Sequence, residues 1–594
     1  MRRLFRVGRV VVAFGLFAAA LGVLAAQPPR IDDPNKIVIS PKKPGTPGGL
    51  PDLPNKSDFI VIRPGGKGPI YPTPTGTQPT QPPSTGSQPT LVSNNGLAVP
   101  APGSPKLDAD VVFDYWFAAS VDGQRIGYVQ WGAKRAKKNN QELLVGVKYQ
   151  NFTVSRFGQV VSQWGEESNV ETPEGAVLVN GMRQGIGKDQ ALVLSGVVEG
   201  KMLKVTGDGA AKGASNTPWP EGVVGCVREP ALFKEKKGMK AGESFGYPAY
   251  IGVVNRVVKM TVTFEGEDTL ALWAKEPARK LLRYTTKMEP VGQFKLPPAT
   301  TWVDAETFEP LKMEFDFPGF GGKVCFLRTT KDAATVAVAR PLELFNAQSI
   351  RLDREIVGIH AGRSVVYKVT AAKDDDPASL FPADDRQQVK NLDAKAKTFE
   401  LHVTASRGPV RVANPLPAPG KEFTESNYFI NWDDDGVKKH AAGALKLLPA
   451  TATDWDKAVA VEKWVKANMR AFEFSQAMAT ADNVAKTLSG DCTEYAMLSA
   501  AMCRAVGVPS RTVLGLVYAP ARDGKPYLAY HMWFEVFAEG QWLPLDATLG
   551  RGGVGPGHLK IADHSWFEEK TFAPLLPVLR VLSAKPAVTV GKVE

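Results

Sequence analysis

The sequence predicts an α+β domain in the C-terminal part of the chain, preceded by a large antiparallel β-rich domain and a disordered Pro-rich linker. Residues 27–106 are dominated by Pro, Gly, Thr, Ser and Asn. Short alternating apolar runs separated by turn pairs follow, a pattern typical of antiparallel strands. Near the C-terminus, two amphipathic helical segments precede further strands. With 594 residues, the chain is also too long for a single hydrophobic core.

Residues 1–26 are interpreted as a signal peptide for export. Four arginines within the first nine residues precede the apolar run Val10–Ala25, and cleavage is expected after Ala25 or Ala26. The run is shorter than the roughly 20 residues of a membrane-spanning helix. We therefore expect a secreted or periplasmic protein with no membrane span after signal cleavage; the alternative is a retained N-terminal membrane anchor.

Residues 27–106 are expected to form a flexible linker, and residues 107–346 the β-rich domain. A first hairpin would join Tyr115–Ser120 to Arg125–Trp131 through Asp122-Gly123, which supplies the positive φ angles of a tight turn. Further predicted hairpins pair Ala191–Val198 with Met202–Thr206, Met260–Phe264 with Thr269–Trp273, and Thr300–Val303 with Leu311–Phe317. The strand rhythm resembles that of lipid-carrier or substrate-presenting envelope domains; the alternative is a structural platform.

Composition and charge argue against several functions. The net charge of +11 is mild for this length, and no basic stripe has interleaved aromatic residues, so we expect no nucleic-acid binding. The acidic runs 374–376 and 433–435 lack the alternating spacing of an EF-hand loop, and we interpret them as solvated turns rather than calcium sites. We expect no metal ion and no cofactor. Four cysteines cannot form a disulfide scaffold, and Cys226 and Cys325 either pair or are separately buried thiols.

Residues 347–594 are expected to form the C-terminal domain, with a leading β segment and a core at residues 454–565. The leading strands are predicted at Ser364–Thr370 and Lys397–Ala405. Apolar periodicity predicts helices at Asp454–Asn468 and Thr493–Val506, the second ended by Gly507. Strands are predicted at Arg511–Tyr518, Leu528–Phe537 and Trp542–Thr548.

Cys492 lies where a turn becomes the second helix, and this position favours reactivity. A helix N-terminus and a nearby imidazolium both lower the pKa of a thiol, and the thiolate is the nucleophilic form. The N–H groups of the first helical turn are also expected to stabilise an oxyanion on an attacked carbonyl. Cys503 would lie roughly 16 Å further along the helix, too far for a disulfide, and is interpreted as a small buried hydrophobe.

A predicted hairpin downstream supplies a histidine and an aspartate. The turn Glu539-Gly540 would pair Ala538 with Gln541. Side chains alternate between the two faces of a strand, so His531, Trp533 and Asp546 would share one face. His531 and Asp546 would then be diagonal neighbours across the hairpin. A thiolate that attacks, an imidazole that moves the proton and a carboxylate that orients the imidazole form a catalytic triad.

The other five histidines are weaker candidates. His360 and His402 are assigned to strand-like segments, and His440 to a polar stretch. His558 and His564 follow the hairpin, and no carboxylate lies at cross-strand spacing from either. We therefore expect these histidines to be structural, with His558 and His564 as possible residues of a cleft.

At these motifs the sequence resembles the bacterial transglutaminase-like superfamily of papain-like cysteine enzymes. The resemblance rests on 489–496 around Cys492, on 531–536 beginning with His531, on Trp542 with 545–548, and on the segment 557–561. It implies that Cys492 is the nucleophile, His531 the general base and acid, and Asp546 the orienting carboxylate. Candidates for a second oxyanion donor are Trp455, Trp464 and Gln476.

The resemblance implies attack of Cys492 on an amide carbonyl and release of the resulting thioester to water or to a second amine. Water would make the protein a peptidase or amidase, and an amine would make it an acyltransferase; we favour hydrolysis, because the sequence has no recognisable amine site. The expected substrate is a protein or peptide in the cell envelope. The alternative is a non-enzymatic envelope module in which the fold is a binding scaffold.

Overall fold

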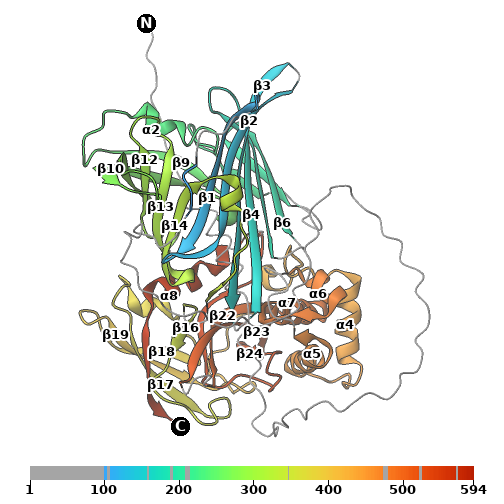
Figure 1. The fold of residues 1–594 in the computed structure, drawn as a ribbon. Helices are drawn as coiled ribbons and strands as arrows, with labels where there is room; N and C mark the ends of the chain where they lie inside the picture. Colours follow the sequence, from blue (N-terminus) through green and yellow to red (C-terminus); the bar gives the residue numbers. More distant parts are fainter. Residues whose placement is uncertain are drawn as a thin grey trace, which may run out of the picture. The chain divides into compact units, whose positions relative to one another are not determined.

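The computed structural model describes residues 99–102 and 108–594, apart from 139, 157–158, 187–190, 208–214, 345–346, 472–478, 521–524, 570 and 572. All described residues belong to one compact unit (Figure 1). The expected signal peptide at 1–26 and most of the expected linker at 27–106 lie outside them. Within the described part of the chain, no helix has the length and apolar character needed to cross a membrane.

Most of the β-rich region is one large sheet, which confirms the predicted antiparallel architecture. Its strand order is β8-β7-β6-β5-β4-β3-β2-β1-β14-β13-β12-β11-β10-β9, and the short β15 pairs in parallel with β3 (Figure 1). The strands are β1 (Val111–Val121), β2 (Gln124–Lys138), β3 (Gln141–Arg156), β4 (Gln159–Glu171), β5 (Val177–Ile186), β6 (Ala191–Glu199), β7 (Met202–Gly207), β8 (Ser215–Pro218), β9 (Ser244–Ile251), β10 (Arg256–Leu270), β11 (Arg279–Met288), β12 (Ala299–Asp304), β13 (Pro310–Phe317), β14 (Gly322–Thr329) and β15 (Leu342–Glu343). Short helices are α2 (Ala231–Glu235) and α3 (Lys331–Ala334).

Three of the four predicted hairpins are confirmed. β1 and β2 are joined by Asp122 and Gly123, with φ angles of 46° and 83°. The pairs β6–β7 and β12–β13 also form, although the β6–β7 turn lies one residue later than predicted.

The hairpin predicted between Met260–Phe264 and Thr269–Trp273 is wrong. Both segments fall along the single strand β10, which continues to Leu270 and pairs with β11. The register shifts between Phe264 and Gly266, and Gly266 has a φ of 127°. A β-bulge at this glycine therefore accounts for a pattern that looks like a turn in the sequence.

Besides the short two-stranded pair β20–β21, the C-terminal region contains two further sheets and most of the helices. One sheet has the order β16-β23-β22-β25, with β24 paired to β23, and the other has the order β18-β19-β17-β26. The strands are β16 (Ser349–Arg351), β17 (Ser364–Thr370), β18 (Gln387–Asp393), β19 (Thr398–Thr404), β20 (Arg470–Ala471), β21 (Ser489–Gly490), β22 (Ser510–Ala519), β23 (Tyr527–Ala538), β24 (Gln541–Leu545), β25 (His558–His564) and β26 (Ala587–Val593). The helices are α4 (Asp435–Leu445), α5 (Asp454–Asn468), α6 (Ala481–Thr487), α7 (Cys492–Ala505) and α8 (Leu576–Ala584).

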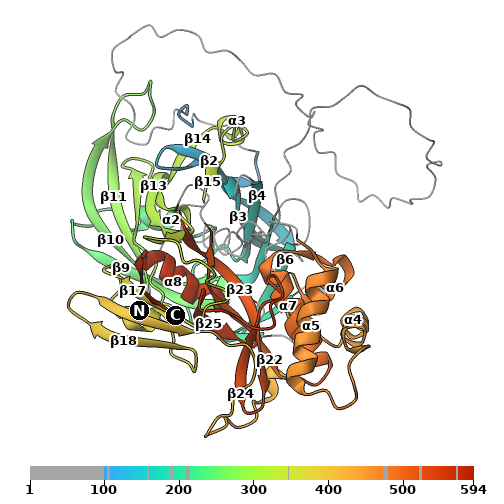
Figure 2. The ribbon, with the colours of Figure 1, turned by 90° about the horizontal axis from the view of Figure 1, so that it is seen from below.

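Helices α5 and α7 match the two predicted helices closely. Thr453 and Asp456 form a capping box that fixes the start of α5. Gly507, with a φ of 81°, follows the end of α7. α7 is buried from Cys492 to Arg504, and it packs on β22 and β23 (Figure 2).

The acidic runs have structural partners. Asp374 accepts two hydrogen bonds from Arg580, at 3.0 and 2.7 Å, and Asp375 forms an ion pair with Lys295. The side chain of Asp434 accepts hydrogen bonds from the first N–H groups of α4 and so caps that helix. The solvated-turn interpretation is therefore incomplete for both runs. All four cysteines are described, and they are buried thiols without disulfides.

Candidate active site

The β23–β24 hairpin brings His531 and Asp546 together as predicted. Ala538 pairs with Gln541 and Phe534 with Leu545, and Asp546 directly follows β24. Nε2 of His531 lies 2.9 Å from Oδ2 of Asp546. Both side chains are buried, with exposed fractions of 3% and 1%. The register predicted from the turn is confirmed.

A second histidine, His558, contacts the same carboxylate oxygen. Its Nε2 lies 3.0 Å from Oδ2 of Asp546. Asp546 is not a cross-strand partner of His558, so the prediction, which considered only carboxylates at cross-strand spacing, did not include this contact. His558 begins β25, which pairs with β22, whereas Asp546 lies beyond the end of β24 on the other side of β23. The residues 557–561 shared with the family resemblance were the signal in the sequence that pointed to it.

The ionised state of Asp546 fixes how both imidazoles carry their protons. Burial alone would raise the pKa of Asp546, but the interaction with His531 and the hydrogen bonds from His531 and His558 outweigh it and hold the pKa well below its usual range. A carboxylate has no proton to donate, so each Nε2 is the donor. Nδ1 of a neutral His531 is then unprotonated, and this buried atom has no hydrogen-bond partner among the described residues.

The loop after β24 is held by Glu462 of α5 and by the loop's own hydrogen bonds. Oε1 of Glu462 accepts from the N–H of Asp546 at 3.3 Å, and Oε2 accepts from the N–H of Gly552 at 2.8 Å. Oδ1 of Asp546 accepts from the N–H of Thr548 at 2.9 Å, so both carboxylate oxygens are occupied. Burial raises the pKa of Glu462 to about 7, against the effect of these hydrogen bonds. The position of Asp546 is therefore fixed from two sides.

Cys492 is the first residue of α7 and is 1% exposed. A capping box flanks it: Oδ1 of Asp491 accepts from the N–H of Thr493 at 3.0 Å, and Oε2 of Glu494 accepts from the N–H of Asp491 at 2.9 Å. Within the first turn of α7, the N–H of Thr493 is therefore occupied by Asp491 and is not among the groups that can stabilise an oxyanion.

Glycine is required immediately before this capping box. Gly490 has a φ of 153°, and a Cβ there would lie 2.4 Å from the side chain of Glu494. Burial raises the pKa of both Asp491 and Glu494, and the charge of Glu494 further opposes ionisation of Asp491. The pair therefore places less negative charge beside Cys492 than two ionised carboxylates would.

The segment that carries these residues matches a known family. Residues 444–547 match the model of the transglutaminase-like superfamily, and this range includes Cys492, His531 and Asp546. The C-terminal domain is transglutaminase-like. His558 lies outside the matched segment.

Solved structures provide more distant similarities, and no curated protein matches the chain. A putative cysteine protease from Cytophaga hutchinsonii is 15% identical, with a TM-score of 0.24, over 39% of this chain and 86% of that one. The periplasmic domain of TgpA from Pseudomonas aeruginosa bound to ethylmercury is 16% identical, with a TM-score of 0.21, over 34% of this chain and 83% of that one. A β-barrel-like protein of domain of unknown function DUF1849 from Brucella abortus is 9% identical, with a TM-score of 0.28, over 36% and 95%.

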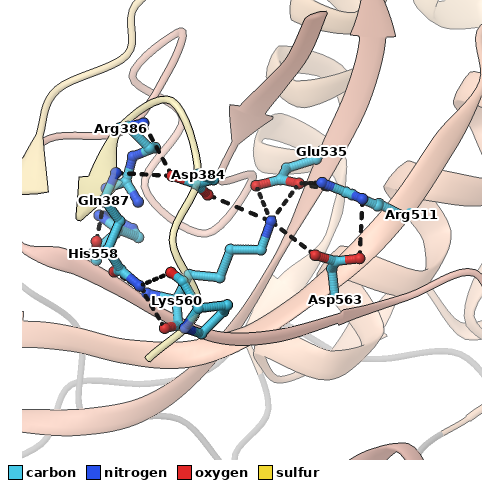
Figure 3. Close-up of polar contacts among 9 residues, drawn as sticks. Asp384, Arg386, Gln387, Arg511, Glu535, His558, Lys560 and Asp563 are labelled. Atoms are coloured by element: carbon cyan, nitrogen blue, oxygen red, sulfur yellow. Dashed lines mark hydrogen bonds and ion pairs between the residues drawn. The ribbon is translucent and has the colours of Figure 1, made fainter. Parts of the chain in front are cut away.

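A buried charge network anchors strand β25 of the transglutaminase-like domain. Figure 3 shows Lys560, two residues after His558, reaching Glu535 at 3.1 Å and Asp563 at 2.9 Å. Arg511 joins the same two carboxylates at 2.7 and 2.9 Å. The guanidinium of Arg386 donates to the backbone carbonyl of His558 at 2.6 Å. These contacts fix the backbone from which His558 reaches Asp546.

The remaining histidines of the transglutaminase-like domain have varied roles. His360 lies in a turn, not in the strand expected for it, and its ring centroid is 5.8 Å from that of His558. Burial lowers the pKa of His360 to about 3, and neither ring nitrogen has a hydrogen-bond partner in the described part of the chain. His402 contacts Glu400 on β19, and His440 contacts the carbonyl of Ala485. The interior near Asp546 thus holds three histidines.

The structure gives two of the three candidate oxyanion donors other contacts. Trp455 lies against Gly408, and Trp464 packs on His440 with ring centroids 4.8 Å apart. Gln476 lies outside the described residues. His531, Asp546 and His558 each offer one ligand atom within 4.8 Å of the others, a spacing that also suits a metal ion. Hydrogen bonds already join these three side chains.

Proposed function

We propose that the transglutaminase-like domain is a thiol enzyme that cleaves or transfers an amide acyl group through a thioester on Cys492. The observation that carries the proposal is the buried contact between Nε2 of His531 and Asp546, which makes Nδ1 the basic nitrogen of the ring. Support also comes from α7, which packs on β23 and begins at Cys492, so that the candidate nucleophile and base lie on adjoining elements. Asp546 would hold the ring of His531 and balance its charge when it is protonated.

The reaction proceeds in two halves. His531 takes the thiol proton, the sulfur of Cys492 attacks the carbonyl carbon, and the departing amine nitrogen receives that proton as the C–N bond breaks. Water or a second amine then gives a proton to His531 as it attacks the thioester carbon. The proton returns to the sulfur when the C–S bond breaks. Hydrolysis is the favoured second half, and the acyl group belongs to a peptide bond or to a glutamine side chain.

We place this enzyme outside the cytoplasm, in the periplasm or secreted, acting on a protein or peptide of the cell envelope. The support is the pattern of residues 1–26, in which arginines precede an apolar run that is followed by small residues. Mass spectrometry of the mature N-terminus tests this placement. A chain that begins after Ala25 or Ala26 agrees with it, and a retained Met1 supports the N-terminal anchor instead.

Alkylation by iodoacetamide near pH 7 tests whether Cys492 is a reactive thiol. Peptide mapping should find Cys492 modified faster than a reference thiol such as glutathione. Cys503 serves as the control within the same helix, because burial raises its pKa far above the ordinary value and it should stay unmodified. A rate for Cys492 at or below that of glutathione favours the non-enzymatic scaffold.

Product analysis with a glutamine-containing peptide distinguishes the two acceptors. Mass spectrometry with and without a primary amine should find mainly the hydrolysed product, and Cys492→Ala should abolish both products. Cys503→Ala should retain them, since Cys503 takes no part in the proposed reaction. An amine adduct as the main product would reverse the favoured second half, and products from Cys492→Ala would contradict the enzyme.

A further inference from the structure

A second polar site lies in the β-rich region, on the inner face of β3 and β4. Lys148 of β3 pairs in register with Glu167 of β4. Glu229, just before α2, forms an ion pair with Lys148. Together with Tyr247 and Tyr250 of β9, these residues line a cavity of about 40 Å³, called the acidic pocket below. It has no contact with the triad residues.

Two atoms that line the acidic pocket are buried and have no hydrogen-bond partner among the residues that the structure describes. They are Oε1 of Glu229 and the hydroxyl of Tyr247, on side chains with exposed fractions of 3% and 2%. A buried polar atom that is unpaired costs about 1–3 kcal/mol, so such atoms call for a partner. Both groups line the same cavity; burial raises the pKa of Tyr247, and the charge on Glu229 raises it further. One bound donor could therefore serve both.

The charges that line the acidic pocket favour a cationic ligand. Glu167 and Glu229 are two carboxylates, and Lys148 is the ammonium group between them. Burial raises the pKa of Glu229 to about 8, and Lys148 only partly offsets this effect. A second cation in the pocket would let both carboxylates ionise.

The shape and walls of the pocket favour a small ammonium group. Trp219 and Tyr250 line it with ring centroids 5.6 Å apart, and aromatic rings attract cations. One water needs roughly 10–15 Å³ of such space, so 40 Å³ holds an ammonium group and its first carbon. Within the described residues, three-ligand metal spacing occurs at His531, Asp546 and His558 and not here, which disfavours a metal ion in the acidic pocket.

We propose that the acidic pocket binds the ammonium group of a primary amine, such as a small alkylamine or a lysine side chain. The ammonium group donates hydrogen bonds to Oε1 of Glu229 and to the hydroxyl oxygen of Tyr247, and Trp219 and Tyr250 cover its first carbon. Asn180 and Tyr250 at the pocket are half-buried, so the pocket is within reach of solvent. The site is independent of the proposed reaction at Cys492.

Calorimetric titration of the full chain with methylammonium chloride at constant ionic strength tests the proposal. Methylammonium should bind with one site per chain, and tetramethylammonium, which has no N–H and is larger, should bind at least tenfold more weakly. Glu229→Gln should weaken methylammonium binding at least tenfold, and Tyr247→Phe severalfold. The control Glu235→Gln, on the exposed end of α2, should leave it unchanged. Cys492→Ala should also leave it unchanged.

The proposal is overturned by an absence of methylammonium binding, by equal binding of the two cations, or by unchanged binding in Glu229→Gln. Circular dichroism verifies that each variant is folded. If Glu229→Gln fails to fold, Tyr247→Phe decides, because it removes one oxygen and keeps the ring; unchanged binding there rejects the site. Loss of methylammonium binding in Cys492→Ala would place the amine at the catalytic thiol and reject the pocket as well.

Discussion

Glu535 in the transglutaminase-like domain and Glu229 in the β-rich region are both buried glutamates that pair with a lysine. Burial alone would raise the pKa of Glu535, but Lys560 and Arg511 together outweigh it and lower that pKa. Lys148 alone is insufficient for Glu229, whose pKa rises to about 8 because of burial. The comparison teaches that the number of matched partners, rather than depth, decides whether a buried acid keeps its charge.

Asp546 belongs to the first kind of site. Hydrogen bonds from two imidazoles keep Asp546 ionised. A negative charge therefore stays beside His531 at any pH near neutrality. The acidic pocket belongs to the second kind, in which a ligand or a change of pH alters the charge. A fixed charge suits orientation of a catalytic base, and an adjustable charge suits binding.

The largest expected effect comes from removing the fixed charge of the triad. Asp546→Asn keeps the shape of the side chain but lets its amide donate to His531, which favours the wrong tautomer. We expect kcat for the glutamine peptide to fall about 10⁴-fold, or ~5 kcal/mol in activation free energy. Steady-state kinetics measure this. Asp433→Asn, which alters an exposed contact with Ser426, is the control; a tenth or more of the activity in Asp546→Asn would contradict the assignment.

Removing one of the two cations that pair with Glu535 should lower the stability of the fold. Lys560→Met leaves Glu535 buried with one cation fewer, and we expect the free energy of unfolding to fall by about 3–5 kcal/mol. Urea denaturation followed by tryptophan fluorescence measures the change. Lys486→Met breaks the exposed pair with Asp482 and should cost less than ~1 kcal/mol. Equal losses in the two variants would mean that the buried network has no special weight.

Glu229, which pairs with one lysine among the described residues, should make the stability of the fold depend on pH. The folded-state pKa of Glu229 lies above its unfolded value, so its contribution to stability is full below about pH 4.5 and is lost as pH rises through 8. At about 1.4 kcal/mol per pKa unit, the loss between pH 5 and 8 is roughly 3 kcal/mol. The groups that face it are Lys148, Glu167, Glu171 and Tyr247. Glu229→Gln should flatten the profile of unfolding free energy, and Glu235→Gln should not.

Local rules sufficed where neighbours in space are also close in sequence. The β23–β24 register follows from a two-residue turn and strict alternation, which placed Asp546 correctly beside His531. The start of α5 follows from its capping box. The contact of His558 with Asp546 could not be predicted in this way, because it depends on how β25 passes the end of β24. The hairpin predicted around Gly266 was wrong for another reason, because glycine occurs both in β-bulges and in turns.

The polar interior of the β-rich region could not be predicted from the sequence either. Lys148, Glu167 and Glu229 are residues that usually lie at a surface, and alternation alone does not say which face of a curved sheet is enclosed. Their pairing appears only when β3 and β4 are in register and the segment before α2 folds over them. The sequence therefore predicted the hairpin that carries His531 and Asp546 and missed the acidic pocket for the same physical reason: only the first is a local structure.

The smallest expected effect concerns the second imidazole on Asp546, and it tests how many donors the fixed charge needs. His558→Leu removes one of the two imidazole hydrogen bonds to Oδ2 of this buried carboxylate, a loss of about 1.5–3 kcal/mol. We expect kcat to fall ~10–100-fold with little change in KM, because His558 orients Asp546 and does not touch the substrate. In this variant, the only imidazole in the described part of the chain that Oδ2 of Asp546 contacts is that of His531. We expect the acid limb of the pH–kcat profile to move to higher pH.

A structural role alone would not move that limb, and His558→Gln separates the two explanations. The glutamine amide can still donate to Oδ2 of Asp546, so it should restore most of the activity and return the acid limb toward its original pH. His402→Gln, whose ring contacts Glu400 on β19, is the control that should change neither. If His558→Leu keeps full kcat and an unshifted profile, one donor is enough for Asp546, and the comparison with Glu229 must rest on Glu535 alone.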